Sequence, residues 1–129
     1  MFILFYFILF LHFLFKQLVP SAPPQDVHGR VLDSKSLKVF WKPPPANKHH
    51  GTITYYKVLY SEDSKKPIKH YNEINVTANE HSLTIKSLKK WTHYRIAVLA
   101  GTKIGDGPAS PFITLRTDED GRSKIMLKN

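Results

Sequence analysis

Apolar residues recur at every second position in several short stretches of the chain, and this spacing predicts β-strands with one buried face. The clearest stretch is 94–100, where Tyr94, Ile96, Val98 and Ala100 share one face. A short polar corner precedes it and a glycine turn follows it. The other strands that we expect from alternation or from short apolar runs lie at residues 27–31, 37–41, 55–60, 68–71, 83–88 and 113–117.

The seven expected strands, the turn-forming residues between them and the lack of a long helical period predict an antiparallel sandwich of two sheets. The sequence contains no cysteine, so no disulfide joins the sheets and the core must be held by packing. Tyr94 follows Leu88 closely, and we expect its hydroxyl to bond the backbone of the corner between them, as in the tyrosine corner of β-sandwiches. The expected structural core consists of Trp41, Tyr56, Val58, Leu88, Tyr94, Ile96 and Val98.

Residues 20–117 resemble a fibronectin type III domain, and the resemblance covers nearly the whole globular part. It rests on Pro23-Pro24, Trp41 followed by Pro43-Pro44, Gly51 before Tyr56-Lys57-Val58, Leu88 with Tyr94 six residues later, Ala100, and the run at residues 105–110. The resemblance implies an all-β fold, a seven-stranded antiparallel immunoglobulin-like β-sandwich. Residues 19–27 are similar to the starts of modules in tandem arrays of neuronal adhesion and guidance receptors, of the netrin-receptor, neogenin and contactin kind.

The chain departs from the family pattern in two places. Lys90 and Trp91 stand where the family usually has Pro-Gly, and Tyr55 stands where many members have Gly. Both places lie on expected surface loops or edges, so they bear on the detail of the corner and not on the fold.

The chain divides into an apolar segment at residues 1–18, the domain at 19–118 and a polar tail or linker at 119–129. As a helix, residues 1–15 would reach about 22 Å, short of a hydrocarbon core of about 30 Å. Three interpretations stay open: a cleaved signal peptide, an uncleaved anchor with Lys16 at its edge, and a start created by an incomplete or alternative transcript. The first two imply export, and the second implies membrane association through residues 1–15.

The net charge of +9, from 19 Lys and Arg against 10 Asp and Glu, is spread along the body and favours acidic partners. Candidate contact loops carry Lys65, Lys66 and Lys69, and a glycine turn carries Lys103 and Asp106. Lysines also cluster at residues 86–90, and either lysine cluster could meet a sulfated polysaccharide or an acidic protein face. A basic surface without a specific role explains the same charges. Nucleic acid is not an expected partner, because no aromatic sheet face or basic recognition helix accompanies the charge.

Asn75 begins the sequon Asn75-Val76-Thr77, which marks an N-glycosylation site in an exported protein. We place this sequon in an accessible polar connection between two strands. Asn75 is therefore the candidate glycosylation site.

No motif of an enzyme, a metal site or a cofactor site is found in the sequence. His49 and His50 are adjacent but have no third ligand at a recognisable spacing, and the acidic residues 118–120 read as a solvated linker. We therefore expect no catalytic residue, no metal and no cofactor. The sequence predicts a non-catalytic extracellular protein-interaction or spacer module of a cell-surface adhesion or guidance receptor. The alternative is a module of an intracellular scaffold protein, with an artefactual N-terminal segment and an unmodified Asn75.

Overall fold

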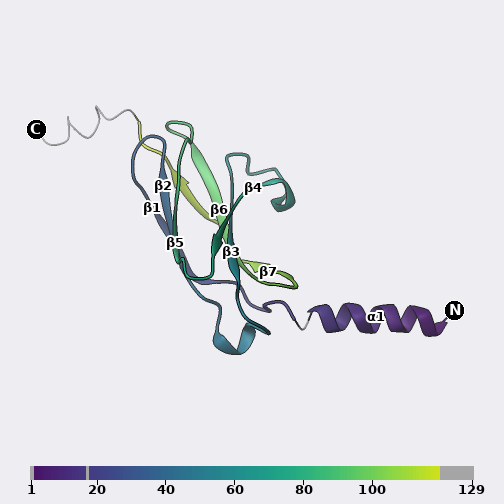
Figure 1. The fold of residues 1–129 in the computed structure, drawn as a ribbon. Coiled ribbons are helices and arrows are strands. Elements are labelled where there is room, and N and C mark those ends of the chain that lie inside the picture. The colour runs from purple at the N-terminus through teal and green to yellow at the C-terminus, as the bar shows by residue number, and fades with distance from the viewer. Residues whose placement is uncertain (1, 17, 120–129) are drawn as a thin grey trace, which may run out of the picture.

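The computed structural model describes residues 2–16 and 18–119 of the chain. The apolar segment forms one helix, α1 (Phe2–Lys16), which precedes the sandwich (Figure 1). Its large hydrophobic side chains from Phe2 to Leu14 are between 37% and 86% exposed. Among the described residues, no helix combines the length and the apolar character that crossing a bilayer requires.

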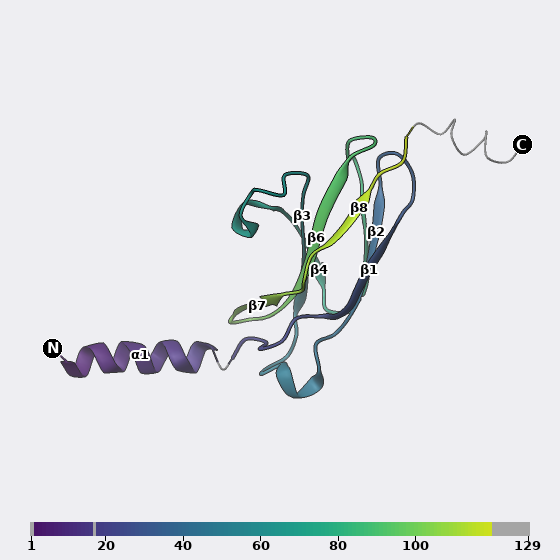
Figure 2. The same cartoon turned by 180° about the vertical axis from the view of Figure 1, so that it is seen from behind.

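Within the described residues, eight strands pair antiparallel in two sheets. The two sheets face each other (Figures 1 and 2). The smaller sheet has the order β1-β2-β5 and consists of β1 (Gln25–Val31), β2 (Leu37–Lys42) and β5 (Ser82–Ile85). The larger sheet consists of β3 (Tyr55–Ser61), β4 (Asn72–Thr77), β6 (His93–Thr102), β7 (Gly105–Ala109) and β8 (Ile113–Arg116). Its order is β4-β3-β6-β7, and β8 also pairs with β6. The predicted immunoglobulin-like sandwich is confirmed.

The eighth strand is β7, which lies where the sequence predicted a glycine turn. The turn itself is at Lys103 and Ile104. After it the chain pairs with β6 twice, first as β7 and then as β8. Between the two pairings, the backbone N–H of Ser110 donates to the Val98 carbonyl at 2.9 Å, and the Ser110 hydroxyl accepts from the Val98 N–H at 2.9 Å. Glycine and proline argue against a central strand, but an edge strand tolerates them, which is why pattern reasoning missed β7.

The prediction of an edge strand at residues 68–71 is wrong. That stretch forms a short 3-10 helix, η2 (Ile68–His70), and the strand begins only afterwards, as β4 (Asn72–Thr77). Pro67 is the N-cap of this helical turn, and its carbonyl accepts from the His70 N–H at 2.9 Å. The alternation of Ile74 and Val76 with polar residues was the overlooked signal for β4.

The main core lies between the two sheets and contains all seven residues named from the sequence. Its largest ring is that of Trp41, which is 3% exposed and packs against Tyr56 with ring centres 5.5 Å apart. Leu37, Val39, Ile85 and Ala100 complete the buried cluster. A second, smaller cluster of Leu59, Tyr71 and Leu99 was not foreseen. The sandwich is thus a rigid body from which the loops project.

Candidate interaction site

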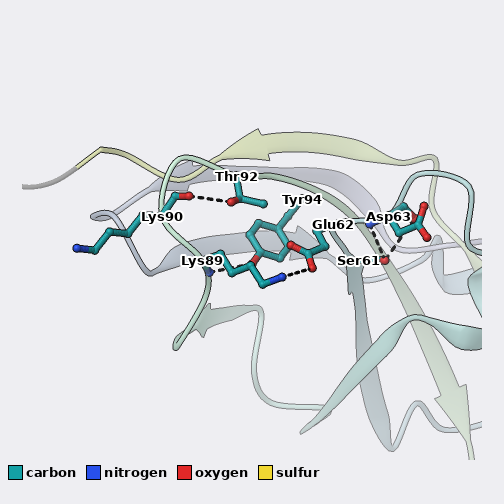
Figure 3. Close-up of polar contacts among 7 residues, drawn as sticks. All are labelled: Ser61, Glu62, Asp63, Lys89, Lys90, Thr92 and Tyr94. Atoms are coloured by element: carbon teal, nitrogen blue, oxygen red, sulfur yellow. Dashed lines mark hydrogen bonds and ion pairs between the residues drawn. The ribbon is translucent and has the colours of Figure 1, made fainter.

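A tyrosine corner fixes the loop between β5 and β6 at one end of the sandwich (Figure 3). The hydroxyl of Tyr94 accepts a hydrogen bond from the backbone N–H of Lys89 at 2.9 Å. The side chain of Leu88, within this loop, is buried, and its N–H donates to the Lys35 carbonyl at 3.0 Å. This loop, residues 86–92, and the segment at residues 62–71 lie at the same end, which we call the loop end.

The structure brings together the two lysine clusters that the sequence places apart. The ammonium of Lys89 lies 2.7 Å from a carboxylate oxygen of Glu62, and this hydrogen bond raises the pKa of Lys89 (Figure 3). Arg95 holds the same segment by donating to the Ser64 carbonyl at 2.9 Å. Between the segments lies a cleft of about 420 Å³, lined by residues that include Lys66, Asn72 and Ser87. Lys65 and Lys69 are exposed on the same segment.

Acidic residues offset the lysines of the loop end. Asp63 accepts from the backbone N–H of Lys65 at 2.9 Å. The hydroxyl of Ser61 accepts from the N–H of Asp63 at 3.0 Å (Figure 3). Glu62 is already paired with Lys89. The cleft therefore presents both signs of charge and several hydrogen-bonding groups, which suits a polar protein contact better than a polyanion.

The other two candidate contact residues lie at the opposite end, Lys103 in the turn between β6 and β7 and Asp106 in β7 (Figure 1). Lys103 is exposed and lines a second cleft of about 500 Å³, together with Leu18 and His50. Asp106 accepts from the hydroxyl of Tyr55 and from the ammonium of Lys57, the latter at 2.9 Å. The five loop residues named from the sequence thus form two groups at opposite ends, and Asp106 is engaged with β3, on the other side of β6.

Tyr55 depends on a glycine opposite it. A Cβ on Gly101 would lie 2.0 Å from Cζ of the Tyr55 ring, so only glycine leaves room for the ring across β6. Burial, followed by the hydrogen bond and the charge of Asp106, raises the pKa of Tyr55 well above its usual value. The hydrogen bond to Asp106 is also the main cause that raises the pKa of Lys57, whose ammonium lies 3.6 Å from Glu73.

Asn75 lies on a strand and not in a connection, which corrects the sequence interpretation. It is in β4, opposite Lys57 of β3, and it is exposed. Because β4 is the outermost strand of its sheet, no strand from the described part of the chain pairs with its other side. Asn75 and Thr77 share the outer face, since side chains alternate along a strand.

The histidines of the loop between β2 and β3 serve the local structure. Nε2 of His49 lies 2.7 Å from the Pro44 carbonyl, and Nε2 of His50 lies 2.8 Å from the Ser21 hydroxyl. No group of three potential metal ligands occurs within residues 2–16 and 18–119. The acidic run 118–120 extends to Asp120, which lies outside the described residues, as does the rest of the tail.

Sequence reasoning did not name Trp91 as a candidate. Its side chain is 51% exposed at the loop end, and its backbone has a φ of +49°. The available signal was the departure from Pro-Gly at Lys90 and Trp91, because a position that favours glycine is often one that needs a positive φ.

The sequence model of the family described as "Fibronectin type III domain" matches residues 22–116 of the chain. The chain belongs to the fibronectin type III family. The matched region is 42% identical to tyrosine-protein phosphatase Lar of Drosophila melanogaster over 105 residues, which is 81% of this chain and 5% of that protein. It is 38% identical to mouse neogenin over 101 residues, which is 78% of this chain and 7% of that protein. The chain therefore spans only a small part of the curated relatives it matches.

Solved fibronectin type III domains have the same fold. The fn3 domain of human contactin 1 has a TM-score of 0.68 at 27% identity and covers 79% of this chain and 82% of that chain. The FN5 domain of Drosophila Lar has a TM-score of 0.62 at 32% identity and covers 78% of this chain and 98% of that chain. The predicted resemblance to neogenin and contactin modules is confirmed, and receptor-type phosphatases, which the sequence did not suggest, are added. What matches in those phosphatases is a non-catalytic module.

Proposed function

We propose that this fibronectin type III domain is an extracellular spacer and protein-contact module of a cell-surface adhesion or guidance receptor. Its similarity to modules of Lar, neogenin and contactin supports this role. In such a module the sandwich sets the distance and direction between neighbours, and the loops supply the contacts.

The observation that carries the spacer role is the position of the two ends of the domain. The leading segment is held at one end, because the Thr102 hydroxyl donates to the Leu18 carbonyl at 2.7 Å and the Ser21 N–H donates to the Lys48 carbonyl at 2.9 Å. The chain leaves at the loop end, where the Asp118 N–H donates to the Asp33 carbonyl at 3.3 Å (Figures 1 and 2). Because the chain enters and leaves the domain at opposite ends, the domain fixes the distance and the direction between the modules on its two sides.

Pro20 strengthens this attachment. It is fully buried, and a Cβ on Gly107 would lie 2.7 Å from the Cβ of Pro20. The backbone of β7 therefore packs closely against the leading segment. The segment before β1 is part of the folded body, so a preceding module would be held by structured chain and not by a loose tether.

Expression of the full chain in a secretory cell line tests the proposal. We expect a secreted product that loses mass when N-glycans are removed enzymatically, and a variant Asn75→Gln that shows no such loss. Asn72→Gln is the matched control, because Asn72 is exposed on the same strand but begins no sequon. A full-length cytosolic product without a glycan would contradict the extracellular role and favour the intracellular scaffold module.

A further inference from the structure

A basic surface lies on the outer side of the smaller sheet, on strands β1 and β2. Cross-strand register places Arg30 of β1 directly opposite Lys38 of β2, and His28 opposite Phe40. Lys42 continues the row along β2. We call these five residues the basic sheet face. None of them was singled out by the sequence, because alternation with the core residues marks them simply as solvent-side positions.

The pairing of Arg30 with Lys38 is electrostatically unfavourable in the isolated domain. Directly opposite residues of an antiparallel pair have Cβ atoms about 5 Å apart, and like charges there destabilise the sheet. Within the described ranges, neither side chain has an ion pair. Asp26 is the acidic residue beside the face, and its carboxylate lies 3.7 Å from the ammonium of Lys42 and 3.8 Å from Nδ1 of His28. A bound anion would remove the repulsion between Arg30 and Lys38. A polyanion should therefore bind this face more favourably than a surface whose lysines and arginines are already paired with carboxylates.

Phe40 holds the two cations in place. The guanidinium carbon of Arg30 lies 5.7 Å from the centre of the ring, and the ammonium of Lys38 lies 5.3 Å from it, both within cation–π range. His28 stacks on the ring with centres 5.2 Å apart and planes 13° apart. The cationic groups are thus ordered before a ligand arrives, which lowers the entropy cost of binding.

We propose that the basic sheet face binds a sulfated polysaccharide chain. This inference rests on the proposed function, because such chains are found at the cell surface. Protein contacts are centred on exposed apolar or aromatic residues and are depleted in lysine, whereas here the aromatic ring is half-buried under cationic side chains. An anionic membrane would also need apolar side chains to insert. The loop end fits less well, because Glu62 and Asp63 offset its lysines.

The test compares two variants that each remove two positive charges. The full chain in a non-ionic detergent is titrated with size-fractionated heparin. Arg30→Gln with Lys38→Gln should weaken binding about tenfold or more and reduce the slope of log K against log salt by about two. Lys65→Gln with Lys66→Gln changes the net charge equally and should weaken binding by no more than about threefold. The melting temperature of the first variant should change little, because the removed repulsion between residues 30 and 38 is offset by the lost cation–π contacts with Phe40.

Equal weakening by the two variant pairs would overturn the proposal, because binding would then depend on net charge alone. Binding to polyglutamate, or to vesicles containing phosphatidylserine, as tight as binding to heparin would also overturn it and assign the face to another class of partner. Heparin binding by a chain that stays in the cytosol would refute the extracellular role and with it a polysaccharide as natural partner. A secreted chain that does not bind heparin would refute only this inference.

Discussion

The guanidinium carbon of Arg116 lies 3.6 Å from the centre of the Trp91 ring. Trp91 also donates its backbone N–H to the Asp118 carbonyl at 3.1 Å, so it is tied to the strand end on which Arg116 lies. Its φ of +49° is a conformation that bulky residues rarely adopt and that costs of the order of 1–3 kcal/mol. The stacking and the hydrogen bond offset part of this cost.

This geometry predicts that Trp91→Gly is more stable than Trp91→Ala by about 1 kcal/mol, because glycine adopts a positive φ without the clash of a Cβ. Both variants lose the indole, so the comparison isolates the backbone term from the stacking on Arg116. The midpoints of urea unfolding give the difference. Equal stability of the two variants would show that the backbone at residue 91 is not strained.

Removal of the buried tryptophan should cost far more than removal of the exposed one. Trp41→Ala leaves a cavity in the core between the sheets, and we expect a loss of about 3 kcal/mol or more. Trp91→Ala deletes the same atoms from a side chain that is 51% exposed, so it serves as the matched control. Similar free energies of unfolding for the two variants would mean that Trp41 is not central to the core.

The tyrosine corner can be tested by the loss of one oxygen atom. Tyr94→Phe keeps the ring but leaves the Lys89 N–H without its acceptor, and we expect a loss of about 1–2 kcal/mol. Tyr60→Phe is the control, because Tyr60 packs beside Tyr94 with ring centres 6.3 Å apart and its hydroxyl makes no hydrogen bond among the described residues. If the two substitutions shift the melting temperature equally, the hydrogen bond from the Lys89 N–H to the Tyr94 hydroxyl does not contribute to stability.

The sequence predicted the core well because alternation reports burial directly. Trp41 and Tyr94 are large, apolar and placed in regular strands, so no tertiary information was needed to assign them. The edges were predicted less well. β4 and β7 are short edge strands, and the glycines and Pro108 of β7 are typical of turns in other contexts.

The candidate surfaces required the structure, because they depend on register. Lys89 and Glu62 are far apart in the sequence, and Arg30 meets Lys38 only through the pairing of β1 with β2. No local pattern specifies such pairs. The exception is Trp91, where the departure from the family's Pro-Gly was visible beforehand and marked a backbone position with a positive φ.

The contact of Asp106 with Tyr55 and Lys57 predicts a loss of stability at alkaline pH. The folded pKa of Tyr55 is raised, first by burial and then by Asp106, and that of Lys57 is raised mainly by its hydrogen bond to Asp106. Above about pH 10 the unfolded chain releases these protons while the folded chain retains them. The free energy of unfolding must therefore fall as pH rises through this range, and the contribution is fully present below it.

Asp106→Asn removes the carboxylate but leaves the burial of Tyr55 unchanged. We expect the variant to lose less stability than the wild type between about pH 8 and about pH 11, because the pKa values of both neighbours move back toward their usual values. Part of the fall should persist, since burial alone raises the pKa of Tyr56 in both proteins. Urea unfolding at the two pH values measures the difference, and Tyr55→Phe should flatten the fall in the same way. If the free energy of unfolding falls equally in wild type and Asp106→Asn, Asp106 does not raise the pKa values of Tyr55 and Lys57.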